Sequence, residues 1–451
     1  MPRLKMQKTH NHLSPIENEE KIKEYYMSTT ETFLSHEEIH ELTRDMREDT
    51  SIIYGEEDQE FGITPYITFY IYHQNEQVEA IANQIIDIYE EFEQQIIDKP
   101  FKRRYRDTGA WKNATKWNPS RQDLISEMQR SFKKYPVYFI GATTGDSPVQ
   151  SARWAFCAQI FDNQHSRYTT LKLSFSEKWY EAHRTHWDEF VEKCLTKLKP
   201  IQAYSGYEIG NSTNFNIVSP EFEIVERIFA DYFYGLDIDH PSNMSHSHDN
   251  PYDYIDLSVL GGGIRTPTWC FLLSPYWLEK LGLTEAQIRL KLSDSRIEIT
   301  RLVDPIDASK FSLWIRLGEL SLYPVEDGVP ELLVMANELI KPIRCNELKL
   351  TTTDAWDDDP NPRFDIEDSP QWIARFDQDS DWPQGKRVST LTNSTSDSTS
   401  LSIKAGERCP KSGYWLSVAE EDSRQYFKQG DVLPDFNSDW GVVYWQFDGE
   451  E

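Results

Sequence analysis

The chain has 451 residues, and its 75 acidic side chains outnumber its 47 Lys and Arg side chains, which gives a formal net charge of -28. This charge excludes nucleic acid and anionic membranes as favourable partners, because both would be repelled, and it favours a basic partner. Hydrophobic residues make up 38% of the chain and aromatic residues 13%, which excludes an acidic disordered polymer and predicts two or three domains with a large core.

The N-terminal segment, residues 1–60, is polar, charged and weakly periodic, so we expect it to be peripheral. One helix is expected at 35–48, because Ser35 and Glu38 form a capping-box pattern. The segment lacks the long apolar run of a secretory signal, and no stretch of the chain reaches the roughly 20 apolar residues of a membrane helix. These observations predict a soluble cytoplasmic protein.

Residues 61–349 form the main predicted domain. The stretch 63–72 is β-branched and aromatic, which predicts a strand, and apolar residues from Val78 to Ile96 then recur at helical spacing. Similar patterns predict further strands at 136–141, 153–161, 169–175, 203–209, 268–273, 296–302 and 312–317, and helices at 121–133, 177–197, 220–234, 275–281, 284–291 and 326–340. Because the two types mix without strict βαβ alternation, the expected class is α+β, with mixed or antiparallel sheets covered by helices on one face.

Residues 350–400 change abruptly in composition and are predicted to connect two domains. Between Asp354 and Asp381 there are ten acidic residues against Arg363 and Arg375, so the local charge is -8. Prolines limit regular structure there, although two helical turns are allowed at 369–376. Nine of the twelve residues from 389 to 400 are Ser or Thr, which is linker composition.

The acids of this connector are interleaved with aromatic residues, a combination that suits a binding surface for a basic partner. A solvated linker held to the fold by its aromatics explains the pattern about equally well, because charge runs are usually only solubilising. The candidate partner-binding residues are Trp356, Asp357, Asp358, Asp359, Asp377, Asp379, Asp381 and Trp382.

Residues 401–451 are short and dense in aromatics. Alternation at 442–447 indicates a strand. Because so few residues are marginal for independent stability, we expect a small β module docked on the main domain.

Histidines offer two candidate metal sites. His240, His246 and His248 could surround zinc, but they lie in a polar, turn-rich stretch without Cys or ordered ligand spacing, so an unliganded loop is favoured. His183 and His186 are three residues apart on a predicted helix. His183 follows that helix's apolar stripe, which favours a half-buried structural histidine. We therefore predict no metal and no cofactor.

Other features that could support chemistry are weaker. The glycine run 261–263 lacks a following GK[ST], which favours a turn entering a strand. Cys409 has Arg408 and Lys411 nearby but no histidine later in the chain, which favours a buried structural thiol. The five scattered cysteines form no CxxC pair and indicate a reducing compartment. Carboxylates are too numerous for the sequence to single out a catalytic pair.

Several stretches, taken together, carry a family resemblance. In the main domain they are 234–241 (YGLDIDHP), 263–277, 280–283, 322–331 and 341–344. They resemble the type VI immunity family, whose members protect a bacterium from toxins delivered by type VI secretion. The stretches 408–415, 427–430, 433–434 and 444–448 are similar to a tail on several groups of bacterial immunity proteins. The resemblance implies a binding protein without catalytic residues.

The leading hypothesis is an immunity protein that binds a cognate type VI secretion toxin and occludes its active site. The charge favours a basic, cytoplasm-acting toxin such as a nuclease. One alternative is a metal-dependent hydrolase that reverses toxin damage with His240, His246 and His248. Another is an adaptor or chaperone that loads an effector for secretion. The oligomeric state is left open.

Overall fold

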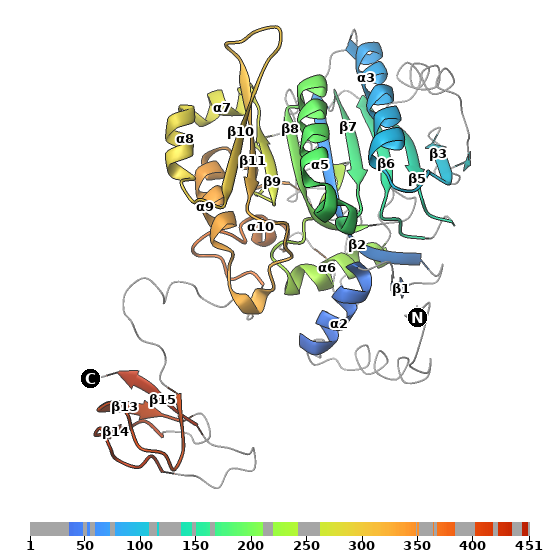
Figure 1. Cartoon of the computed structure of the whole chain (residues 1–451). Helices are drawn as coiled ribbons and strands as arrows, with labels where there is room; N and C mark the ends of the chain where they lie inside the picture. Colours follow the sequence, from blue (N-terminus) through green and yellow to red (C-terminus); the bar gives the residue numbers. More distant parts are fainter. Residues whose placement is uncertain are drawn as a thin grey trace. The chain divides into compact units, whose positions relative to one another are not determined.

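The computed structural model in Figure 1 describes sixteen parts of the chain, namely residues 36–47, 52–54, 59–72, 77–107, 115–116, 137–146, 150–162, 167–210, 220–241, 262–348, 350, 364, 368–383, 402–417, 423–434 and 444–449. The chain divides into two units, Met1–Val388 and Ser389–Glu451. Each has its own sheet and apolar core. The predicted α+β class is confirmed, and so is the small C-terminal sheet, whose docking stays a prediction.

The first unit is built on an eleven-stranded sheet in which every described strand pairing is antiparallel. The strand order is β10-β11-β9-β8-β2-β7-β6-β5-β3-β4, and β1 pairs with β2. The strands are β1 (Ile52–Tyr54), β2 (Gln59–Tyr72), β3 (Arg103–Asp107), β4 (Thr115–Lys116), β5 (Val137–Thr143), β6 (Ala155–Asp162), β7 (Arg167–Ser174), β8 (Gln202–Gly210), β9 (Cys270–Leu273), β10 (Ile297–Val303) and β11 (Phe311–Leu317).

Helices cover both faces of this sheet, not one face as predicted. The central strand β2 is buried on both sides along residues 61–71, so each face needs its own apolar cover. The helices are α2 (His36–Arg47), α3 (Val78–Glu91) with its π-helical continuation η2 (Phe92–Ile96), α5 (Glu177–Leu198), α6 (Pro220–Tyr232), α7 (Pro275–Leu281), α8 (Glu285–Lys291), η4 (Val325–Asp327), α9 (Glu331–Ile340), η5 (Lys341–Ile343) and α10 (Asp368–Ile373). None of the described helices is both long enough and apolar enough to cross a membrane.

Two separate cores lie on the two faces. On one face α3 and α5 lie side by side (Figure 1). The rings of Phe92 and Phe190 stack there with their centroids 5.9 Å apart. These residues pack with Phe69 of β2 in the same core. The opposite core collects residues of α6, α9 and α10, including Phe229, and it borders the polar groups described below.

Most predicted elements are confirmed to within a few residues. The helix predicted at 275–281 has the bounds of α7, and Ser176 caps the long α5 by accepting a hydrogen bond from the Trp179 N–H. The helix predicted at 326–340 is wrong in its first part, because Gly328 has a φ of 89° and α9 begins only after Pro330. The helix predicted at 121–133 lies outside the described residues.

The turn after the glycine run does not lead directly into a strand. Ile264 makes one isolated bridge with Arg344, and β9 begins only at Cys270. Gly263 has a steric reason to be glycine: a Cβ there would lie 2.4 Å from the Ile343 carbonyl oxygen. The close approach holds this turn against the segment at Ile343 and Arg344, where η5 ends.

Residues 368–383, which we call the strap, are the main described part of the predicted connector 350–400. They belong to the first unit, whose boundary falls after Val388. Four strap side chains are buried in the core of that unit: Trp372, Ile373, Phe376 and Trp382. The aromatics of the acid-rich stretch are therefore core residues wherever the structure describes them.

The second unit contains a four-stranded antiparallel sheet in the order β12-β15-β13-β14. Its strands are β12 (Ser402–Lys404), β13 (Gly413–Leu416), β14 (Gln425–Phe427) and β15 (Tyr444–Gly449), the last of which confirms the strand predicted at 442–447. Its core includes Trp415, Trp445 and Cys409. The Cys409 thiol is buried and donates to the Lys411 carbonyl at 3.0 Å, as expected for a structural thiol.

Candidate functional site

Five charged side chains meet in the interior of the first unit, and we call Lys172, Glu208, Asp237, Asp239 and Arg265 the ionic cluster. Asp237 and Asp239 follow α6 and are two residues apart in extended chain, so their side chains leave on the same side. Both carboxylates are 0% exposed, and the Arg265 side chain is 5% exposed. Burial on this scale requires that every charge has a partner.

Strand register explains why the cluster forms here. Tyr66, Thr68 and Tyr70 of β2 alternate with Ile67 and Phe69, which belong to the core under α5. The three polar residues therefore point to the opposite face. In the antiparallel ladder Thr68 lies opposite Lys172 of β7, and Thr64 lies opposite Glu208 of β8. The strand register therefore places Lys172 and Glu208 on the same face of the sheet as Thr68.

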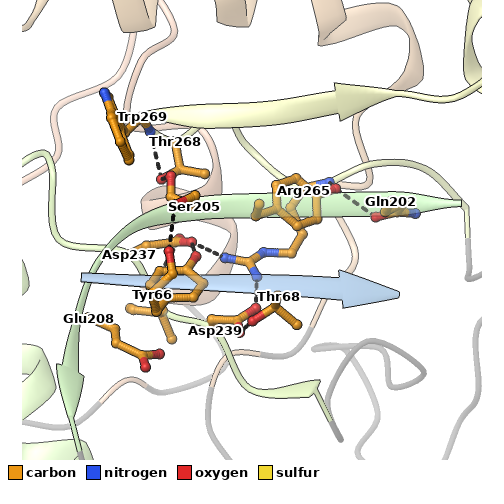
Figure 2. Close-up of polar contacts among 12 residues, drawn as sticks. Tyr66, Thr68, Gln202, Ser205, Glu208, Asp237, Asp239, Arg265, Thr268 and Trp269 are labelled. Atoms are coloured by element: carbon orange, nitrogen blue, oxygen red, sulfur yellow. Dashed lines mark hydrogen bonds and ion pairs between the residues drawn. The ribbon is translucent and has the colours of Figure 1, made fainter. Parts of the chain in front are cut away.

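Arg265 joins the two aspartates. One Nη donates to Asp237 and the other to Asp239, so the planar guanidinium bridges two carboxylates (Figure 2). The guanidinium lies 4.7 Å from the centroid of the Tyr204 ring, whose hydroxyl accepts the Arg265 backbone N–H at 2.8 Å. Arg265 thus locks the segment after the glycine run onto the loop that follows α6.

Asp239 receives the largest number of donors. The Thr68 hydroxyl donates at 2.6 Å, the Tyr70 hydroxyl at 2.7 Å, and the Lys172 Nζ lies 3.1 Å away. Burial alone would raise the pKa of this carboxyl, but the charges of Lys172 and Arg265 and the hydroxyl donors outweigh it. The pKa of Asp239 therefore lies well below its ordinary value, and the group is ionised in the folded protein.

Glu208 behaves differently although it shares Lys172. Burial raises the pKa of Glu208 to about 8, and the charge of Lys172 only partly opposes this shift. Burial lowers the pKa of Lys172, but Glu208 and Asp239 outweigh the effect and raise it. Glu208 is consequently the member of the cluster whose protonation changes near neutral pH.

The histidine candidates do not form a described metal site. His240 is buried and its Nε2 lies 2.8 Å from a Glu226 carboxylate oxygen, so this nitrogen already has an intramolecular partner. His246 and His248 lie outside the described residues. Within the described ranges, no group of three or more His, Cys, Asp or Glu side chains is arranged to hold a metal ion.

The expectation for His183 is wrong, because its side chain is exposed instead of half-buried. A local distortion of α5 explains the difference. His183 has φ -134° and ψ 30°, which turns its ring onto Trp179, with centroids 4.6 Å apart, while Nδ1–H donates to the Trp179 carbonyl at 2.9 Å. His186 is also exposed, and both histidines lie on the helix surface.

The predicted binding residues fall into three groups. Trp356, Asp357, Asp358 and Asp359 lie outside the described residues. Asp379 and Asp381 are exposed at the end of the strap. Asp377 and Trp382 are buried, so their side chains face the protein. The structure separates the four described residues into an exposed and a buried pair, and the role of all eight in partner binding stays a prediction.

Asp377 and Trp382 have clear intramolecular partners. Arg344 donates to both oxygens of Asp377, at 2.7 and 2.9 Å, and the Asn337 amide donates at 2.6 Å. Burial opposes ionisation, but Arg344 and Asn337 outweigh it and lower the pKa of Asp377 to about 2. Trp382 stacks on Phe364 with centroids 5.8 Å apart. Both residues hold the strap in place.

Sequence reasoning missed Arg265, which is the centre of the ionic cluster. It follows a glycine run that was interpreted only as a turn. One signal was available in the stretch Leu236-Asp-Ile-Asp239, where two acids alternate with apolar residues. Acids in an apolar, extended stretch are buried and need a cation. The sequence nevertheless does not say which cation it is.

The arrangement compensates charge inside the protein and leaves its polar groups directed at one another. A family model for type VI immunity matches residues 84–376, which is more than half of the 451 residues. The chain is therefore a member of a type VI immunity family. That family is TsiV, described as type VI immunity for VRR-NUC, and the predicted resemblance is confirmed.

Solved structures support the fold. The chain is similar to the Pseudomonas aeruginosa T6SS protein PA0821, with a TM-score of 0.56 and 18% sequence identity over 81% of this chain and 92% of that chain. At this identity the likeness shows the fold alone. The toxic C-terminal tip of CdiA from Pseudomonas aeruginosa in complex with immune protein also matches, over 35% of this chain and 98% of that chain, but its TM-score of 0.21 and 9% identity support no argument. No curated protein matches the chain in sequence.

Proposed function

We propose that the protein binds the VRR-NUC nuclease toxin of its own cell and inhibits it by covering the toxin's active site. Membership of the TsiV family is the observation that carries this proposal. Inhibition is stoichiometric, because one folded surface occupies one toxin and no turnover takes place. The toxin is neutralised in the cytoplasm, where a nuclease meets its substrate.

Charge supports the choice of a basic partner. A nuclease that binds phosphates presents a cationic cleft, and exposed carboxylates can occupy such a cleft in place of the phosphates. The chain has a net charge of -28, and the strap ends in the exposed Asp379 and Asp381. We assign the exposed end of the strap, together with the acids 357–359 of the same acid-rich stretch, to the toxin contact. Asp377 and Trp382 support that surface from inside.

Two measurements test the proposal. Deleting the gene from a producing strain should cause self-killing by the toxin encoded beside it, and purified protein should bind a catalytically inactive form of that toxin. The affinity should fall as NaCl rises, because salt screens the attraction between opposite charges. No binding would overturn the proposal. A viable deletion strain that only fails to deliver its toxin would point to a secretion adaptor.

Matched charge reversals locate the contact. Asp379→Lys with Asp381→Lys changes the net charge from -28 to -24, and so does Glu181→Lys with Glu189→Lys on the exposed side of α5. The strap pair should weaken toxin binding about tenfold, mainly by slowing association, and the α5 pair should have a much smaller effect. Equal losses would mean that bulk charge, and not the strap, attracts the toxin.

A further inference from the structure

The hairpin formed by β10 and β11 exposes apolar side chains at its tip. Ile306 is 88% exposed and Val303 is 44% exposed, and both belong to this one hairpin. Figure 1 shows the connecting loop projecting past the neighbouring strands. Exposed aliphatic side chains of this size are common singly, but here they stand beside a pocket, which makes the combination informative.

The pocket lies where the loop of the same hairpin joins its two strands, and it is a cavity of about 60 Å³ that is open to solvent. The end of α5 and the start of α7 form its other walls. Its lining is mainly apolar and includes Leu195, Pro200, Leu272, Pro275, Val303 and Phe311. Val303 therefore belongs to the pocket wall, and Ile306 stands three residues away as a protruding apolar group.

The rim of the pocket is electrically neutral, unlike the chain as a whole. Lys199 pairs with Asp304 at 2.9 Å, and Lys310 pairs with Asp307 at 3.7 Å. Two copies of a protein with a charge of -28 repel each other over most of their surfaces. A locally neutral, apolar patch is where that repulsion is weakest. A basic partner has no electrostatic reason to choose it.

The hairpin tip is already ordered before any partner binds. The Asp304 carboxylate accepts the Ile306 backbone N–H at 2.8 Å, and Asp307 accepts the Ser309 hydroxyl at 2.6 Å. The Arg301 guanidinium lies 4.1 Å from the centroid of the Phe311 ring at the base. Because Ile306 is already held in position in the free protein, less conformational entropy is lost when a partner binds.

We propose that this hairpin is the interface of a homodimer, in which Ile306 of each copy enters the pocket of the other. A two-fold axis places the protruding Ile306 of each copy at the pocket of the other copy, because a two-fold interface uses the same patch on both copies. The toxin contact at the strap is a different surface. The dimer therefore does not depend on the proposed inhibition, and either proposal can fail alone.

Sedimentation equilibrium of the full chain tests the dimer at concentrations from about 1 to about 200 μM, at low and high NaCl. A reversible dimer should form, and salt should strengthen it because screening weakens repulsion between like charges. Toxin binding should respond to salt in the opposite direction. A monomer at every concentration and salt level would overturn the proposal.

Two substitutions at exposed positions locate the interface without threatening the fold. Ile306→Asp places a charge in both pockets of the dimer, so it should weaken dimerisation by at least about thirtyfold. Leu290→Asp is the control, because Leu290 is 75% exposed on α8 and does not line the pocket. It should leave the dimer intact. A dimer unaffected by Ile306→Asp, or equally weakened by both variants, would overturn this interface. An Ile306→Asp variant that loses toxin binding while the unmodified chain is monomeric would assign the patch to the toxin instead.

Discussion

The ionic cluster and the outer end of the strap both present carboxylates, and they differ in what neutralises the charge. Asp237 and Asp239 are buried and share one guanidinium from Arg265. Asp379 and Asp381 are exposed, and water can solvate them. Part of the net charge of -28 therefore belongs to groups that hold the fold together, and only the exposed part can attract a partner.

Asp377 shows that the division does not follow the sequence. It lies two residues before Asp379 in the same acid-rich stretch, yet Arg344 and Asn337 bind its carboxylate in the interior. Local charge density is therefore a poor guide to which acids are available. The decisive property is the presence of a buried cation, because an unpaired buried carboxylate costs far more than an exposed one.

Replacing Arg265 should destabilise the fold most strongly, because Arg265 neutralises the buried carboxylates that distinguish the ionic cluster from the strap. Arg265→Met removes the guanidinium that bridges the buried Asp237 and Asp239 and leaves Lys172 as the paired cation of Asp239, so the free energy of unfolding should fall by about 3–5 kcal/mol in urea denaturation. Arg184→Met removes an exposed pair with Glu319 and should cost about 0–1 kcal/mol. If Arg265→Met prevents folding, Arg265→Lys provides a milder test and should be destabilised more than Arg184→Met. Similar losses in the buried and the exposed pair would contradict the distinction.

Asp377→Asn should have the next largest effect. It removes the charge that Arg344 and Lys341 face, so unfolding should become easier by about 2–3 kcal/mol at neutral pH. The pKa of Asp377 is lowered to about 2 in the folded state, so its contribution is present above the ordinary value of 3.8 and is lost as pH falls towards 2.

Unfolding measured between pH 2 and pH 5 tests the sign of this effect. The variant should lose less stability than the unmodified chain as the pH falls. Asp379→Asn is the matched control and should stay within about 0.5 kcal/mol of the unmodified chain. A control as destabilised as Asp377→Asn would place both residues in the same environment.

The sequence predicts what depends on local periodicity. The spacing of apolar residues predicts α5 and α7, and the run of β-branched and aromatic residues at 63–72 predicts β2. The ionic cluster depends instead on tertiary pairing. Arg265 lies 28 residues after Asp237 and meets it only because β2, β7 and β8 bring their polar faces together. No local pattern encodes that meeting.

The exposure of the candidate binding residues was predicted only in part, for a related reason, and their role in binding stays a prediction. A run of acids and aromatics indicates a surface feature, and Asp379 and Asp381 are indeed exposed. Trp382 follows immediately and is 1% exposed, because it fills space beside Phe364 and Tyr234 in the first unit's core. Composition describes the whole stretch, whereas burial is decided for each side chain by what it packs against.

The last prediction concerns Glu208 and Asp239, two acids of the ionic cluster whose pKa values are shifted in opposite directions. The pKa of Glu208 is raised to about 8 by burial, so its favourable contribution is present below the ordinary value of 4.5 and is lost as pH rises through 8. Glu208→Gln stays neutral beside Lys172, and its unfolding free energy should fall less than that of the unmodified chain between pH 5 and pH 9. If the unmodified chain instead gains stability over this range, Lys172 outweighs burial and Glu208 is ionised like Asp239. The cluster would then hold one more ionised carboxylate beside Lys172, and its interior would be less strictly neutral than the comparison with the strap implies.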